Sequence, residues 1–172
     1  MSDRSKIEWT DASWNPVRAR DKATGKIGWY CEHASDGCRF CYAESFNRRL
    51  GTGLPFKPGH RDDVEIFLDR KTLGEPLHWR RPRKIFAGSM TDLGGDWLSW
   101  DDLDEIMAIA GLCWQHRFIF LTKRSKALCD YLLHAGTPDR IDKRMNEIAS
   151  RIARPARAAR SASLSCASGQ PK

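Results

Sequence analysis

Three cysteines within eleven residues constrain this chain more than any other feature. Cys31, Cys38 and Cys41 are spaced C-x6-C-x2-C, and the residues after Cys41 have a helical pattern. Thiolates this close in sequence can point at one centre from a single loop, which is how proteins bind zinc or an iron–sulfur cluster. The sequence therefore predicts a metal centre within residues 31–44.

The number of thiolates bears on which metal this centre holds. A [4Fe–4S] cluster with three cysteine ligands has one iron free for a substrate or cofactor, whereas a structural zinc site needs a fourth protein ligand. His33 and His60 are the candidates for that fourth ligand. Ligand count and spacing favour iron–sulfur over zinc, and three unligated cysteines are the remaining alternative.

The charge of the chain is concentrated at its C-terminus. The 172 residues carry a net charge of +7, of which Arg151, Arg154, Arg157, Arg160 and Lys172 supply +5 with no acidic residue among them, leaving +2 for residues 1–150. The basic balance alone is therefore no argument for nucleic-acid binding. With no long apolar run and no apolar signal core, we expect a reduced, cytoplasmic protein without a membrane span.

Hydrophobic periodicity predicts an α/β fold. Apolar runs at 84–89 and 117–121 are typical of buried parallel strands, and amphipathic helices are expected after Ser99, after Ser125 and around residues 141–152. Nearer the N-terminus, the pattern predicts a strand at 6–10 and a surface loop at 18–26. A helix is expected at 42–50, with an inward apolar face formed by Tyr42, Phe46 and Leu50.

Three polar clusters fall at the ends of predicted strands: the cysteine loop, Ser89 to Asp92, and Thr122 to Arg124. Alternation of strands and helices favours a parallel sheet built of βαβ units. Ligands of such sheets lie beyond the carboxyl ends of the strands. We therefore expect the three clusters to converge on one site.

Several separated motifs together cover roughly residues 5–135: Ile7 to Asp11 with Trp14-Asn15-Pro16, Gly37-Cys38, Cys41 to Glu44, Ser89 to Leu93, and Leu121 to Arg124. In these motifs the chain resembles an uncharacterised family of phage and bacterial proteins that carries a domain of unknown function. That family is similar to the radical SAM iron–sulfur enzymes, whose motif is C-x3-C-x2-C with an aromatic residue before the third cysteine. Phe40 occupies that position here, while the first gap is six residues.

The resemblance implies a partial (β/α) barrel over residues 1–150. The expected later strands are missing, so we expect a C-terminal truncation, with residues 151–172 as a disordered basic tail rich in Ala, Arg and Ser. It also implies a cytoplasmic protein of a bacterial host, encoded by the bacterium or by a prophage.

The resemblance implies roles for individual residues as well. Cys31, Cys38 and Cys41 would bind three irons, and the fourth iron would bind S-adenosylmethionine. Asp92 would accept the ammonium of that cofactor, with Ser89, Thr91 and Phe40 beside it. Lys123 and Arg124 would hold its carboxylate or a substrate anion. The alternatives are that Asp92 caps a turn and that the two cations are a solvated pair next to a helix start.

Two functions from different classes follow. The first is a radical SAM enzyme with an external electron donor and an unknown substrate, for which a nucleotide or nucleic acid is attractive by analogy alone. Whether this chain is active is left open. The second is a zinc-stabilised binding module without catalysis, associated with nucleic acid.

Overall fold

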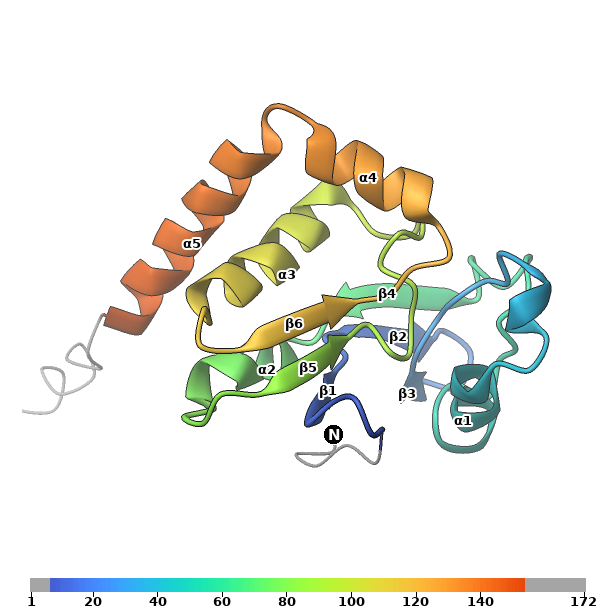
Figure 1. The fold of residues 1–172 in the computed structure, drawn as a ribbon. Coiled ribbons are helices and arrows are strands. Elements are labelled where there is room, and N and C mark those ends of the chain that lie inside the picture. The colour runs from blue at the N-terminus through green and yellow to red at the C-terminus, as the bar shows by residue number, and fades with distance from the viewer. Residues whose placement is uncertain (1–6, 154–172) are drawn as a thin grey trace, which may run out of the picture.

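The computed structural model describes residues 7–153, which form two three-stranded sheets and the helices around them (Figure 1). In the first sheet all strands are parallel, in the order β1 (Ala12–Trp14), β5 (Lys84–Ala87), β6 (Arg117–Phe120). The second sheet is antiparallel, with β2 (Val17–Asp21) between β3 (Ile27–Gly28) and β4 (Val64–Leu68). The fold is therefore mixed α/β, and no barrel closes among the described residues.

Helices connect the strands and cover one side of the parallel sheet. The elements are η1 (Asp36–Cys38), α1 (Tyr42–Leu50), α2 (Arg70–Leu73), η2 (Glu75–His78), α3 (Trp100–Leu112), α4 (Ser125–Leu133) and α5 (Thr137–Ala153). Helix α3 links the parallel strands β5 and β6 and packs against α5. In Figure 1, α1 and α5 lie at opposite ends of the molecule. None of the helices described here has the length and apolar character that crossing a bilayer would require.

One main core joins the two sheets to α3. It includes Trp14 of β1, Val17 of β2, Ile85 of β5 and Ile106 of α3, each no more than 1% exposed. Because β1 runs almost directly into β2, the Asn15-Pro16 turn between them ties the sheets together. A smaller cluster lies under the cysteine loop and consists of Trp29, Ala43, Phe56 and Met90, with Cys31 and Cys41 packed against it.

The later half of the sequence prediction is confirmed, and two early elements are wrong. The strands near 84–89 and 117–121 form and are parallel, and the helix after Ser99 begins with a capping box between Ser99 and Asp102. Residues 7–10 form turns and bends, and the first strand is Ala12–Trp14. The expected loop at 18–26 contains β2, because the alternating buried residues Val17, Ala19 and Asp21 fit the middle of an antiparallel sheet.

Helix 42–50 forms as expected, but the side chains that face the protein differ from the prediction. Tyr42, Phe46 and Leu50 are 56%, 39% and 61% exposed, while Glu44 and Asn47 are buried. At the other end, residues 151–153 belong to α5. The rest of the predicted tail lies outside the described residues.

Candidate functional site

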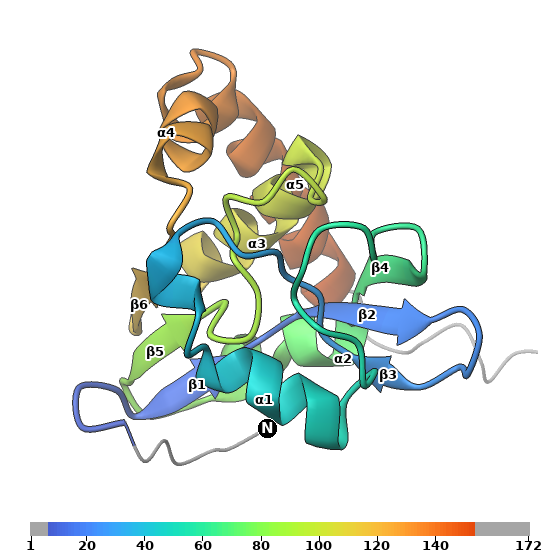
Figure 2. The same ribbon diagram turned by 90° about the vertical axis from the view of Figure 1, so that its right-hand side faces the viewer.

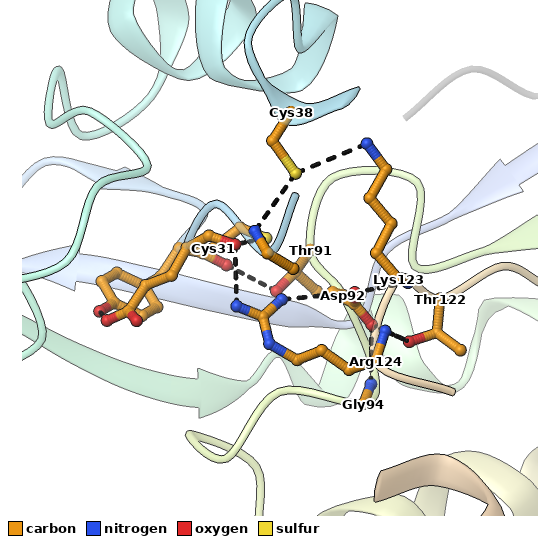
Figure 3. A network of polar contacts seen from close by, with 11 residues as sticks. Cys31, Cys38, Thr91, Asp92, Gly94, Thr122, Lys123 and Arg124 are labelled. Carbon is orange, nitrogen blue, oxygen red and sulfur yellow. Dashed lines mark hydrogen bonds and ion pairs between the residues drawn. The ribbon is translucent and has the colours of Figure 1, made fainter. Parts of the chain in front are cut away.

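The three polar clusters meet at one cavity of about 490 Å³. It lies beyond the carboxyl ends of β5 and β6, and Figure 3 shows Cys38 above Asp92, Thr122 and Arg124, which follow these strands. All nine site residues predicted from the sequence line it: Cys31, Cys38, Phe40, Cys41, Ser89, Thr91, Asp92, Lys123 and Arg124. The expected convergence is therefore present in the fold.

Gly88 makes the first of the strand-end turns possible. It follows β5 with a φ of 74°, a backbone conformation that other residues rarely adopt. A Cβ atom there would meet the Leu93 side chain at 2.8 Å. The glycine thus lets the chain turn sharply from the buried strand into Ser89 to Asp92.

The Cys38 sulfur has a backbone amide and a lysine ammonium as hydrogen-bond donors. The Ala34 amide lies 3.4 Å from the Cys38 Sγ, and the Lys123 Nζ lies 3.5 Å from the same sulfur (Figure 3). Burial opposes ionisation of this thiol, but the backbone amides of Ala34 and Ser35 and the Lys123 ammonium outweigh it, and the pKa of Cys38 is lowered. The surroundings of Cys38 therefore make its thiol easier to deprotonate than an ordinary cysteine.

Cys31 lies deeper and behaves differently. Burial raises the pKa of its thiol to about 11; a hydrogen bond from the Asp92 backbone opposes this rise, the charge of the Asp92 carboxylate adds to it, and Arg124 opposes it. Metal binding would displace this proton, because the thiolate is the ligand. Cys41 is half-buried at the N-cap position of α1.

Asp92 ties the ends of β5 and β6 together. Its carboxylate accepts hydrogen bonds from the Thr122 hydroxyl and, at 2.9 Å each, from the backbone amides of Gly94 and Lys123. The Arg124 guanidinium lies 3.4 Å from the same carboxylate. These contacts agree with the turn-capping alternative for Asp92, since its oxygens already have donors within the protein.

Arg124 and Lys123 point in different directions. Arg124 donates to the carbonyl of Glu32 at 2.9 Å and stacks over the Trp97 ring at 4.7 Å, so it joins β6 to the cysteine loop. Lys123 instead extends toward Cys38. Of the two predicted cations, Lys123 is the one whose charged atom reaches a cysteine.

The remaining predicted residues of the second cluster bind other segments. The Thr91 hydroxyl donates to the carbonyl of Tyr30 at 2.6 Å. The Ser89 hydroxyl is paired with the Asn15 side chain, whose Oδ1 also accepts from the Met90 amide at 3.0 Å. Phe40 is 90% exposed at the cavity rim. Thr91 and Ser89 thus hold the site together.

The candidates for a fourth zinc ligand lie elsewhere. His33 Nε2 is 2.6 Å from a Glu44 carboxylate oxygen, and His60 Nδ1 is 2.8 Å from an Asp63 carboxylate oxygen. Neither histidine lines the cysteine cavity. Within residues 7–153, no three His, Cys, Asp or Glu side chains are grouped so as to hold a metal ion.

The donor set nevertheless fits an iron–sulfur cluster in its chemistry. Three thiols face one shared cavity, with Lys123 beside one of them. A cluster distributes its ligands over several irons and so does not need them gathered around a single ion. These three thiols are therefore the residues that would hold a cluster.

Asn15 and Asn47 are functional neighbours that the sequence reasoning missed. Asn15 holds the Ser89-Met90 turn, and Asn47 is fully buried and binds backbone groups of Trp29, Thr52 and Leu54 near the cysteine loop. Asn15 belongs to the Trp14-Asn15-Pro16 motif of the family resemblance, and that motif was the available signal.

These observations define a mixed α/β protein with a cysteine-lined cavity at the carboxyl edge of a parallel sheet. A family described as "Protein of unknown function (DUF5131)" matches residues 4–142, which is most of the chain, and the protein belongs to that family. The predicted membership of a family with a domain of unknown function is thus confirmed. Searches of curated proteins and of solved structures gave no significant match.

Proposed function

We propose that this chain is an iron–sulfur protein of the radical SAM type, with a partial (β/α) barrel. Cys31, Cys38 and Cys41 would hold a [4Fe–4S] cluster whose fourth iron binds S-adenosylmethionine. The single observation that carries the proposal is the meeting of all three cysteines with the ends of β5 and β6 at one cavity.

When bound, the cluster would supply the electron for reductive cleavage of S-adenosylmethionine. The residues of the chain would support the cluster in two ways, by stabilising a ligand and by fixing the segments around it. Lys123 donates toward the Cys38 sulfur and places a positive charge beside a ligand that must be anionic. Asp92 and Arg124 fix the positions of the two strand ends and the cysteine loop. An external electron donor would approach from the side of the exposed Phe40 ring.

The metal content of anaerobically purified and reconstituted protein tests the proposal. We expect about four irons per chain and a broad visible absorption band. Replacing Cys31, Cys38 or Cys41 with Ser should each abolish the band. Cys129→Ser is the matched control, because Cys129 is exposed and does not line the cavity. One tightly bound zinc with no colour would contradict the proposal and support the zinc-stabilised binding module.

A second measurement addresses the cofactor. S-adenosylmethionine should change the electron paramagnetic resonance spectrum of the reduced cluster, because it would occupy the open iron. A normal cluster whose spectrum S-adenosylmethionine leaves unchanged would contradict the radical SAM part of the proposal and leave the iron–sulfur part standing.

A further inference from the structure

A second cavity, which we call the aromatic groove, lies beside the cysteine cavity. It has a volume of about 430 Å³, and its walls include Ile7, Arg18, Trp29, Tyr42, Phe46 and Met90. Tyr42, Ser89 and Met90 line both cavities. A molecule in the groove would therefore lie next to the three cysteines.

The aromatic walls come from the outward face of α1 and from the strand-end residue Trp29. The Trp29 and Phe46 rings contact each other edge to face, with centroids 6.1 Å apart. The Tyr42 hydroxyl is used in a 2.8 Å hydrogen bond to the Ser89 carbonyl, which fixes its ring over the boundary between the two cavities. Figure 2 shows α1 on the near side of the molecule, in front of β1. These rings offer flat apolar surfaces to a ligand.

Two hydrogen-bond donors at the groove have no acceptor. The Trp29 Nε1 and the Arg18 Nε are buried, and neither has a hydrogen-bond partner in the described part of the chain. Trp29 is 9% exposed, so its indole N–H is removed from water as well. Buried donors are rarely left unpaired because each one costs about 1–3 kcal/mol. Both groups are donors only, so the partner they lack is an acceptor.

Arg18 adds a charge to this arrangement. Its guanidinium stacks over the Trp29 ring at 4.3 Å. Burial lowers the pKa of Arg18 while Asp69 opposes this change, and a guanidinium keeps its proton under such conditions. The groove thus combines flat apolar walls with one cation and two unpaired donors.

We propose that the aromatic groove binds a flat aromatic ring that carries a negatively charged or carbonyl acceptor group. The ring would lie against Phe46 and Trp29, and the acceptor would face Arg18. Binding of this ligand would depend only on the residues of the groove and would not require an iron–sulfur cluster. Its use as the substrate site of a radical SAM reaction rests on the proposed function, because only then does the shared wall with the cysteine cavity have a chemical purpose.

Titration of the protein with defined compounds, followed by calorimetry, tests this proposal. The probes are the four nucleoside 5′-monophosphates, benzoate and phenylpropionate, with ribose 5-phosphate and inorganic phosphate as anions that lack an aromatic ring. We expect saturable binding of a ringed anion and none of the ringless ones. Binding of nucleotides alone or of aromatic carboxylates alone would support the site and identify the source of its ligand.

Variants then locate the binding. Arg18→Gln and Phe46→Ala should each weaken binding about tenfold or more, which corresponds to about 1.4 kcal/mol. Arg20→Gln and Leu50→Ala are the matched controls on the same strand and the same helix, because neither residue lines the groove. Circular dichroism of each variant checks that it folds. Phe46→Ala keeps the test decisive if Arg18→Gln fails to fold, since Phe46 is partly exposed.

Failure of this inference can be told apart from failure of the proposed function. Titrations are repeated with Cys38→Ser protein, and iron is measured in every sample. Ringed-anion binding by Cys38→Ser protein that lacks iron supports the groove as an independent site, and ringed-anion binding by reconstituted wild-type protein that lacks iron supports the groove and contradicts the cluster. A normal cluster with no ringed-anion binding, or with binding that Arg18→Gln and Phe46→Ala leave unchanged, overturns the groove proposal alone.

Discussion

Helices α1 and α3 are both amphipathic, but they present opposite faces to the protein. In α3 the apolar residues Leu103, Ile106 and Ile109 are buried in the main core. In α1 the apolar residues Tyr42, Phe46 and Leu50 are at least 39% exposed, and the buried residues are Ala43, Glu44 and Asn47. The hydrophobic pattern thus predicted both helices, but it predicted the buried face correctly only for α3.

The difference reflects what each helix packs against. Helix α3 covers a sheet whose backbone groups are already paired, so apolar contacts stabilise it. Helix α1 packs against loops whose backbone groups need partners. The Asn47 side chain accepts from the Trp29 amide at 2.9 Å and donates to the Leu54 carbonyl at 3.0 Å. Polar contacts therefore hold α1, which leaves its apolar face free to form the aromatic groove.

The largest expected effect is in α3. Ile106 is fully buried, so Ile106→Ala should lower the free energy of unfolding by about 4 kcal/mol through lost burial and the cavity left behind. Urea denaturation measures this change. Ile106→Val, which removes a single methyl group, should cost about 1 kcal/mol. If both variants cost under 1 kcal/mol, the packing role assigned to α3 is wrong.

The second prediction tests the polar anchoring of α1. Asn47→Ala should lower the free energy of unfolding by about 3 kcal/mol, because it leaves buried backbone groups of Trp29, Thr52 and Leu54 unpaired. Hydrogen exchange at the Trp29 amide should also accelerate. Arg49→Ala, on the exposed side of the same helix, is the control and should cost under about 0.5 kcal/mol. Equal stability of the two variants would refute the anchoring role.

The third prediction concerns pH and the buried Glu44. Burial opposes its ionisation, but hydrogen bonds from His33 and Arg48 hold the pKa of Glu44 below its ordinary value of 4.5. A carboxylate with a lowered pKa stabilises the folded state above its unfolded pKa, and this contribution disappears as the pH falls through the folded pKa. Glu44→Gln should therefore cost about 1–2 kcal/mol at neutral pH.

The difference in stability between wild type and Glu44→Gln should be constant above about pH 5 and shrink below about pH 4.5. Urea denaturation across this range measures it. Subtracting the variant removes the contributions of other carboxylates with lowered pKa values, such as Asp69. A difference that grows as the pH falls would contradict the assigned contacts.

The smallest effect is expected on the outward face of α1. Leu50 is 61% exposed, so Leu50→Ala should change the free energy of unfolding by less than about 0.5 kcal/mol. Thermal denaturation with circular dichroism detects a larger change. A loss near that of Ile106→Ala would mean that this face is covered in solution, which would erase the contrast between the two helices.

Much of the parallel sheet could be predicted because its sequence signals are local. The run from Lys84 to Ala87 is almost wholly apolar, and Ser99 with Asp102 encodes a helix start within four residues. The antiparallel sheet was missed because β2 is rich in charged residues. Its pairing depends on β4, more than forty residues later in the chain. Such pairing is a tertiary property, and no local pattern contains it.

The sequence alone determined the chemistry that this chain can offer: the spacing of Cys31, Cys38 and Cys41 and the polar residues after two apolar strands. The covalent structure of the chain fixes these residue types and their spacing before it folds. Only the tertiary structure decided how they are used. It paired Asp92 with the end of β6, brought Lys123 to Cys38, and turned the aromatic face of α1 outward. These outcomes depend on contacts between segments that are far apart in the sequence. Such contacts form, and contribute their free energy, only when the whole chain packs.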